Sequence, residues 1–359
     1  MKEILKPGIH WLYLFIPITF VLEFLHVSAP LIFFSASLSI IPIARLIGHS
    51  TEHLASYTGD SVGGLLNATF GNLPELIIAI IALKAGLHEM VLASLAGAIL
   101  ANLLLALGVS FLVGGIRHHS QEYNPVSIKV YSSMMMIAAL SLLVPSAFNR
   151  ISQSGIVIFG EDNLNVIISV MLLVAYILYL VFMLKTHPDF FRSEGPQDHT
   201  HPEKRWSVKR AFITLIGASV MAAFMSEVLV GAAEETGKVL GMSSVFIGVI
   251  FLAIVGGAAE SISAITMAAK NKMDLSIGIA LGSSIQIALF VAPLLVLMSL
   301  FVGPSQMNLG FSRALIGSIF IAVLIGGIIS GDGKSNWYKG VQLILAYLII
   351  AMMFYFIPS

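Results

Sequence analysis

The sequence contains no cysteine, which excludes disulfides, thiolate metal sites, iron–sulfur clusters and cysteine nucleophiles. Charged residues are scarce as well: they make up 11% of the 359 residues, against roughly 25% in a soluble domain. Positive and negative charges balance, and the basic residues are scattered rather than clustered along a phosphate-binding stripe. Nucleic acid is therefore excluded as a partner, and any metal ion must be held by oxygen atoms or histidine.

Hydrophobic residues make up 57% of the chain, too many for a water-facing shell to enclose. A hydrocarbon core about 30 Å thick needs roughly 20 apolar residues per helix, which excludes a peripheral or single-pass protein of this length. The apolar runs predict an all-α, polytopic membrane protein with about eleven transmembrane helices embedded in the lipid bilayer. The predicted spans are 9–25, 30–54, 62–83, 90–112, 126–143, 164–184, 211–230 or one turn beyond, 245–269, 275–300, 314–329 and 341–357.

The distribution of lysine and arginine predicts the orientation of the chain. With eleven spans and a cytoplasmic N-terminus, 15 of the 19 basic residues lie on the cytoplasmic side and 4 on the outer side. A wrong span count would scramble this asymmetry, because every later loop would change sides. The four basic residues on the outer side are Lys84, Arg150, Lys238 and Arg313.

Two glutamates occupy corresponding places in the two halves of the chain. Glu75 ends the segment Gly-Asn-Leu-Pro-Glu (71–75) of the third predicted span, and Glu260 ends Gly-Gly-Ala-Ala-Glu (256–260) of the eighth. A carboxylate at the bilayer centre costs roughly 2.5–3.5 kcal/mol on insertion scales, so two at equivalent places indicate a functional pair. The step from third to eighth span is odd, so the second half is inverted, as in alternating-access secondary transporters.

Aligning Glu75 with Glu260 defines a register between the two halves, called here the glutamate register. It extends beyond the glutamates without a gap, because it also pairs Gly63 with Gly248 and Gly97 with Gly282. The register divides the remaining spans into two repeats of five helices, and the first predicted helix belongs to neither repeat. The predicted organisation is an extra first transmembrane helix (1–27), a first five-helix repeat (28–185), a cytoplasmic loop (186–210) and an inverted second five-helix repeat (211–359).

Oxygen atoms surround the two glutamates. Glycine and proline before each one weaken the helix and free backbone carbonyls, and amides and hydroxyls lie at the midpoints of the partner spans. Such a flexible oxygen cage with two negative charges suits Ca²⁺, which takes six to eight oxygen ligands; Mg²⁺ resists dehydration, Zn²⁺ prefers histidine or cysteine, and Mn²⁺ stays open. The candidate cation ligands are Glu75, Glu260, Asn72, Asn102, Ser283 and Gln286.

Each neutral candidate also has an alternative role. Asn102, Ser283 and Gln286 suit interhelical hydrogen bonding, and Asn72 is either a ligand or a helix cap. For the glutamates, two close carboxylates in a low-dielectric environment cannot both stay ionised cheaply, so the empty site is expected to take up protons. Ca²⁺ would then displace these protons, which makes one site sufficient for antiport. No cofactor is expected.

Three segments resemble the cation/proton exchanger branch of the calcium/cation antiporters: Asn-Ala-Thr-Phe-Gly-Asn-Leu-Pro-Glu-Leu (67–76), Thr51-Glu52 upstream, and Gly-Ser-Ser-Ile-Gln-Ile (282–287). The likeness covers nearly the whole chain. The second half differs in having Gly257 and Ser261 where the family pattern has asparagine and histidine.

The resemblance implies export of cytoplasmic Ca²⁺ in exchange for H⁺, with Glu75 and Glu260 as shared ligands. It further implies that Asn102, Ser283 and Gln286 supply supporting oxygens. The membrane is not fixed by the motif, and the short N-terminal segment favours a bacterial cell membrane.

Several alternatives remain open at this point. A Na⁺/Ca²⁺ exchanger of the same fold, a cation channel and an intramembrane hydrolase using Ser61 are the other functions considered, and a homo-oligomer is compatible with the sequence. Glu52 and the pair Glu234–Glu235 either attract cations to the two mouths or relay protons, or they only solvate helix ends. The histidine-rich and acidic loop 186–210 is either a sensor of Ca²⁺ or pH or a solvated connector.

Overall fold

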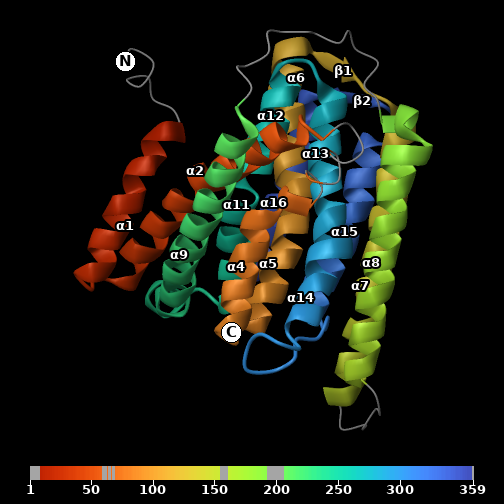
Figure 1. Cartoon of the computed structure of the whole chain (residues 1–359). Helices are drawn as coiled ribbons and strands as arrows, with labels where there is room; N and C mark the ends of the chain where they lie inside the picture. Colours follow the sequence, from red (N-terminus) through yellow and green to blue (C-terminus); the bar gives the residue numbers. More distant parts are fainter. Residues whose placement is uncertain are drawn as a thin grey trace, which may run out of the picture.

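A computed structural model describes residues 9–58, 63, 66, 69–153, 161–191 and 206–357, most of which form a bundle of long helices (Figure 1). The α-helices are α1 (Phe15–Phe24), α2 (Ala29–Ala55), α4 (Leu73–Lys84), α5 (His88–Leu100), α6 (Leu107–His118), α7 (Pro125–Gln153), α8 (Glu161–Val181), α9 (Val208–Leu240), α10 (Ser244–Phe246), α11 (Ala253–Gly256), α12 (Ala258–Ala269), α13 (Met273–Gln286), α14 (Ala292–Met298), α15 (Arg313–Ser330) and α16 (Trp337–Phe356). The π-helical segments are η2 (Ala101–Ala106), η3 (Phe182–Thr186), η5 (Ile247–Leu252) and η6 (Ile287–Val291), and the 3₁₀ helices are η1 (Ile9–Leu14) and η4 (Pro188–Phe191).

Eight helices in the described part of the chain are long and apolar enough to cross a membrane. The pair Ser244–Gly256 and Ala258–Ala269, which is bent by 58°, brings the number to nine if the pair is counted as one broken span rather than a re-entrant loop. The first predicted span corresponds to the shorter apolar helix His10–Phe24, and the third ends in α4, with most of residues 59–68 outside the described ranges. The helical, multi-pass fold is therefore confirmed, and the count of eleven stays a prediction.

Two helices continue beyond the predicted apolar spans. The helix α7 extends to Gln153, past the predicted end at 143, and α9 extends to Leu240, past the predicted end at 230 or one turn beyond. Polar residues end an apolar run without ending a helix, because backbone hydrogen bonding continues through them. The end of α9 is set by Gly241, whose φ of +66° lies in the left-handed region that favours glycine.

A short pair of antiparallel strands, β1 (Ser120–Glu122) and β2 (Lys334–Asn336), joins two loops at one end of the bundle. The Lys334 Nζ lies 2.9 Å from Glu122 Oε1, and both side chains are exposed. The sequence does not indicate this pair, because such short strands leave no periodic pattern.

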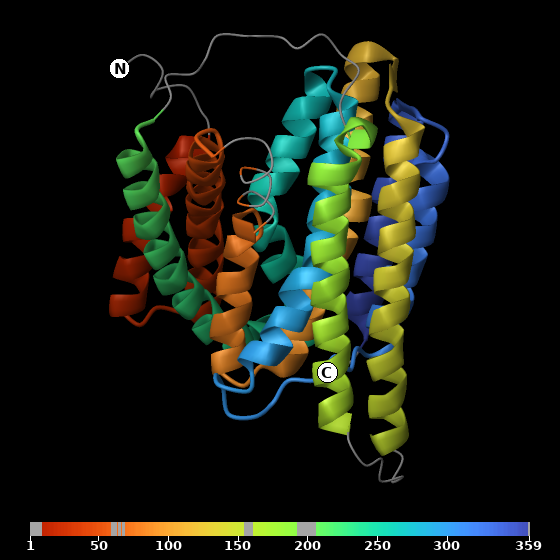
Figure 2. The ribbon, with the colours of Figure 1, turned by 45° about the vertical axis from the view of Figure 1, so that its right-hand side comes forward.

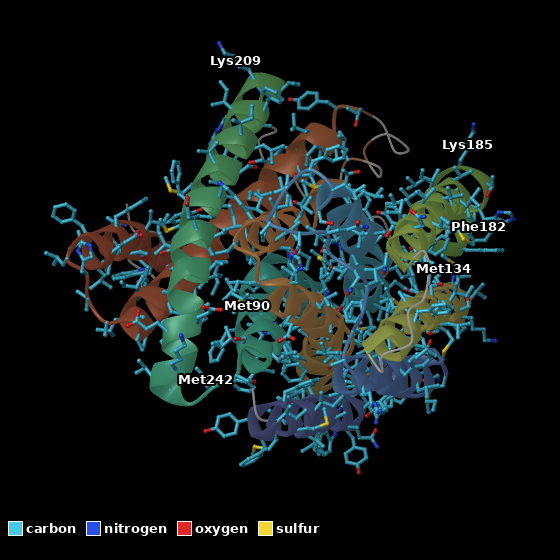
Figure 3. The ribbon with its side chains drawn as sticks, turned by 90° about the horizontal axis from the view of Figure 1, so that it is seen from below. Met90, Met134, Phe182, Lys185, Lys209 and Met242 are labelled. Atoms are coloured by element: carbon cyan, nitrogen blue, oxygen red, sulfur yellow. The ribbon has the colours of Figure 1, made fainter. Side chains whose placement is uncertain are left out.

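The helices that carry the glutamates lie in the middle of the bundle. Seen from below, Met90 of α5 lies near the centre, whereas Phe182 and Lys185 at the end of α8 lie at the edge (Figure 3). The helix α2 packs along α9, α5 packs against η5, and α12 packs against α13 and α6. The central helices are therefore shielded from lipid by α1, α2 and α9 on one side and by α7 and α8 on the other (Figure 1).

The backbones of α5 and η5 touch at two glycines. A methyl group on Gly97 would lie 2.2 Å from the carbonyl oxygen of Val249, and one on Gly248 would lie 2.7 Å from the Cβ atom of Ala93. Contacts this short leave no room for a larger side chain, so glycine at both positions permits the close crossing of the two spans that flank the site.

The half-helices α4 and α12 run in opposite directions from the middle of the bundle. Figure 1 and Figure 2 show α4 extending to the lower end and α12 to the upper end, where β1 and β2 also lie. The glutamate register matches both ends of these helices, since it pairs Leu73 with Ala258 and Lys84 with Ala269. It also pairs the first residue of α5 with that of α13, and the first residue of α6 with that of α14.

Cysteine labelling tests the predicted orientation, because the chain has no cysteine of its own. Lys270 follows α12 at the upper end, and Lys238 lies in the last turn of α9 at the lower end; both are exposed. A membrane-impermeant maleimide applied to intact cells is expected to label a Lys238→Cys variant and not a Lys270→Cys variant. Permeabilised cells, in which both should react, are the control; the reverse pattern in intact cells would contradict a cytoplasmic N-terminus.

Candidate cation-binding site

Glu75 and Glu260 each lie in the first turn of a half-helix. Asn72 precedes α4 with φ −93° and ψ 25°, and Gly257 precedes α12 with φ −80° and ψ 13°, so the backbone leaves helical geometry just before each carboxylate. Pro74, in the first turn of α4, suits a helix start and cannot continue a preceding helix. The partial positive charge of a helix N-terminus favours a carboxylate there.

The carboxylate of Glu75 is buried without a hydrogen-bond donor. The residue is 7% exposed, and neither Oε1 nor Oε2 has a partner among the described residues. The Oε2 atom of Glu260 is also buried without a partner, although the Glu260 residue as a whole is only partly buried. A buried, unpartnered carboxylate is costly, so this pair requires either protons or a cation.

The four neutral candidate ligands form one hydrogen-bonded chain. The Asn72 Nδ2 donates to Gln286 Oε1, the Ser283 hydroxyl donates to Asn72 Oδ1 at 2.7 Å, and the Asn102 Nδ2 donates to Ser283 Oγ at 3.0 Å. The interhelical hydrogen bonding named as the alternative role of Asn102, Ser283 and Gln286 is therefore present in this conformation. The side chain of Asn72 does not cap α4.

A cavity of about 480 Å³ leads from this chain towards the upper end of the bundle. Its deep end is lined by Glu260 together with Asn72, Ser283 and Gln286, and Glu75 does not line it. Residues at the ends of α2, α8 and α12 and at the start of α13 line the mouth. They include Arg45, His49, Glu52, Met183, Thr266 and Asp274.

The two glycines before α12 pack against the carboxylate of the other half-helix. A methyl group on Gly256 would lie 2.9 Å from the Cγ atom of Glu75. One on Gly257 would lie 3.6 Å from Glu75 Oε1 and 3.7 Å from Asn102 Oδ1. Two oxygen atoms from different helices therefore converge on this short backbone segment.

The remaining predicted positions are separated from one another. Glu52 lines the mouth of the cavity, whereas Glu234 and Glu235 are exposed near the end of α9 at the other end of the bundle. Ser61 and most of the loop 186–210 lie outside the described residues. Among those that are described, no group of three or more histidine, aspartate and glutamate side chains is placed to hold a metal ion.

Two features of the site have no counterpart in the sequence analysis. Asp274 lines the mouth of the cavity and accepts a hydrogen bond from the backbone N–H of Asn124 at 2.7 Å. Trp206 stacks on His53 with ring centroids 4.8 Å apart and lies under the Arg210 guanidinium. The contacts of Trp206 join the start of α9 to the end of α2 beside the mouth of the cavity. Their sequence signal is weak, because one aspartate and one tryptophan at helix ends are ordinary interfacial residues.

Comparisons with known proteins agree over both halves of the chain. The sequence profile of the family described as sodium/calcium exchanger protein matches residues 28–185 and 210–356. The Ca(2+)/H(+) antiporter of Aphanothece halophytica is 40% identical over 363 residues, covering 97% of this chain and 96% of its own length.

The Ca(2+)/H(+) antiporter ChaA of Bacillus subtilis is 41% identical over 342 residues, covering 95% of this chain and 96% of that protein. The solved structure of native YfkE superposes with a TM-score of 0.84 at 38% identity, covering 98% of this chain and 100% of that one. These similarities extend over nearly the full length of each protein compared.

The contact between Gly256 and Glu75 predicts the effect of one added methyl group. In a Gly256→Ala variant the new Cβ would meet Glu75 Cγ at 2.9 Å, so the Glu75 side chain must shift and its carboxylate moves with it. We expect cation transport by this variant, measured as ⁴⁵Ca²⁺ uptake into vesicles, to fall at least about tenfold, since misplaced ligating atoms lose binding steeply.

Gly217→Ala is the matched control for this substitution. Gly217 is exposed on α9, and a methyl group there meets no atom within 4 Å. Its transport is expected to equal that of the unmodified protein. Normal transport by Gly256→Ala at an equal amount of folded protein would show that the position of Glu75 tolerates this displacement.

Proposed function

This chain belongs to the sodium/calcium exchanger protein family, in its cation/proton exchanger branch, and we propose that it exports cytoplasmic Ca²⁺ in exchange for H⁺. The observation that carries the proposal is the buried, unpartnered carboxylate of Glu75, together with the buried, unpartnered Oε2 atom of Glu260, beside a chain of neutral oxygens. Its relatives are named as Ca²⁺/H⁺ antiporters. The chain is accordingly a transporter whose metal ion is its substrate.

The donor set favours Ca²⁺ over other divalent cations. Glu75 and Glu260 contribute two negative charges, and Asn72, Asn102 and Gln286 offer amide oxygens. Hard oxygen ligands on mobile side chains, with room for water in the adjoining cavity, suit the six to eight ligands that Ca²⁺ takes. Zn²⁺ has no thiolate here, because the chain lacks cysteine.

Proton coupling follows from the burial of the same carboxylates. Glu75 is buried without a partner, and the Oε2 atom of Glu260 is buried without one as well, so keeping both carboxylates ionised without a cation is costly and protons neutralise them when Ca²⁺ is absent. Ca²⁺ binding must then release these protons, because the metal needs the ionised carboxylates. The two substrates therefore compete for one site, which is the requirement for antiport.

We propose that two inverted repeats, 28–185 and 211–359, alternate the access to this site, with residues 1–27 as an extra first helix and 186–210 as a cytoplasmic connection. The glutamate register supports the repeat, because it matches the bounds of α4 with those of α12 and the start of α5 with that of α13. The opposite directions of α4 and α12 support the inversion. The family profile also matches two segments, one in each proposed repeat.

The cavity supports a conformation that is open to the cytoplasm. It runs from Glu260 to the ends of α2 and α12, where Lys270, Lys272 and Arg117 also lie, and basic residues favour the cytoplasmic side. Glu260 therefore faces cytoplasmic ions in this state, and Glu75 lies behind it. A cell membrane with the N-terminus in the cytoplasm is the proposed location.

Transport into proteoliposomes tests this function. With an acidic interior, we expect ⁴⁵Ca²⁺ uptake by the reconstituted protein to follow the imposed pH gradient. Glu75→Gln and Glu260→Gln each remove one charge and one exchangeable proton, so each variant should lose at least about tenfold in uptake. Glu89→Gln is the matched control, because Glu89 is exposed at the start of α5 and does not line the cavity that reaches Glu260.

Two other results would overturn the proposal in different ways. Uptake that follows a sodium gradient and ignores pH would make the protein a Na⁺/Ca²⁺ exchanger of the same fold. Uptake indifferent to both gradients, together with currents far above carrier turnover, would make it a channel.

A further inference from the structure

The four polar residues of the hydrogen-bonded chain have no polar counterparts in the other repeat. All four of its residues pair, in the glutamate register, with positions that offer no polar side chain. The pairs are Asn72 with Gly257, Asn102 with Ile287, Ser283 with Ala98, and Gln286 with Ala101. An exact repeat would place such a hydrogen-bonded chain on both sides of the two glutamates, whereas this protein has the chain on one side.

A second cavity lies where the missing chain would be. It measures about 10 Å³ and adjoins Glu75, with room for at most one water molecule. Its lining includes Ala98 and Ile287 from the apolar set, aliphatic side chains of α4, α5 and η5, and the hydroxyl of Ser94, which donates to the Val91 carbonyl.

The linings of the two cavities correspond in part. The glutamate register pairs four residues that line the small cavity with four that line the large one. These pairs are Glu75 with Glu260, Ile78 with Ser263, Ser94 with Ile279, and Ala98 with Ser283. The small cavity therefore occupies the place that the cytoplasmic cavity occupies in the other repeat.

We infer that the small cavity beside Glu75 is the outer exit of the transport pathway in its closed form, and that its aliphatic lining makes the outward-facing site a weaker Ca²⁺ site than the cytoplasmic one. Ala98 and Ile287 are then the residues that set this difference. The inference rests on the proposed exchange function and on the inverted arrangement of the repeats.

The direction of the effect follows from ligand supply. Ca²⁺ requires six to eight oxygen ligands, and the cytoplasmic cavity offers Ser283 and Gln286 beside Glu260. On the outer side an opening cavity brings Ala98 and Ile287 to the ion instead. Water must complete the ligand shell there, so the ion leaves more readily. A difference in Ca²⁺ affinity between the two faces is offset by the equilibrium between the cytoplasm-facing and outward-facing conformations. The ion gradients therefore still set the net direction of transport.

Measuring the KM for Ca²⁺ at each face tests the inference. Everted vesicles present the cytoplasmic face and right-side-out vesicles the outer face, and an acidic interior drives ⁴⁵Ca²⁺ uptake in both. We expect the unmodified protein to have a KM at least about tenfold higher at the outer face. Ala98→Ser adds a hydroxyl to the small cavity and should lower the outer-face KM by about threefold or more, with the cytoplasmic-face KM changed less than about twofold.

Two further variants keep the test decisive if Ala98→Ser folds poorly. Ser283→Ala removes the corresponding hydroxyl and should raise the KM at the cytoplasmic face by about threefold or more, with a smaller effect at the outer face. Ala96→Ser is the matched control, because Ala96 is buried on the same helix as Ala98 and lines neither cavity; both of its KM values should stay unchanged.

Equal KM values at the two faces of the unmodified protein would overturn the inference and leave proton-coupled exchange standing. The inference also fails if Ala98→Ser or Ser283→Ala shifts the KM equally at both faces. An absence of pH-driven uptake in either vesicle orientation would instead overturn the proposed function, so the two failures are distinguishable.

Discussion

The placement of two carboxylates inside the helix bundle, with three of their four oxygens buried without a hydrogen-bond donor, is the constraint on which the rest of this structure depends. Glu75 and Glu260 lie in the first turn of half-helices, where the partial charge of the helix terminus offsets some of the cost of burial. The breaks at Asn72 and Gly257 create these two helix starts within the membrane. An unbroken helix would place each carboxylate against a neutral helix interior and remove the free backbone groups around it.

Close approach of the helices is the second requirement, because a cation ligated from both halves needs oxygens from several spans within reach of one another. Glycine residues meet this requirement in two kinds of contact, one between backbones and one between a backbone and a side chain. Gly97 and Gly248 allow the backbones of α5 and η5 to touch, and Gly256 leaves space for the side chain of Glu75. The chain therefore uses small residues where bulk would separate the ligands, and places its large aliphatic side chains around them.

The sequence predicts what depends on periodicity and on the cost of charge in a membrane. It yields most of the spans, and it singles out Glu75, Glu260 and the four neutral residues that the structure joins in one chain. Side-chain geometry is different, because it depends on the packing of residues far apart in the chain. The contact of Gly256 with Glu75, the cavity that reaches Glu260 but not Glu75, and the strands β1 and β2 therefore emerge only from the structure.

The hydrogen-bonded chain explains how the site can keep its shape without a cation. Asn72 Oδ1 accepts one hydrogen bond from Ser283, and Gln286 Oε1 accepts one from Asn72. An amide oxygen has two lone pairs, so each can still face a metal ion while it keeps its protein donor. Interhelical bonding and cation binding are thus compatible roles for the same atoms: the first holds the neutral ligands in place, and the second adds the charge that Glu75 and Glu260 require.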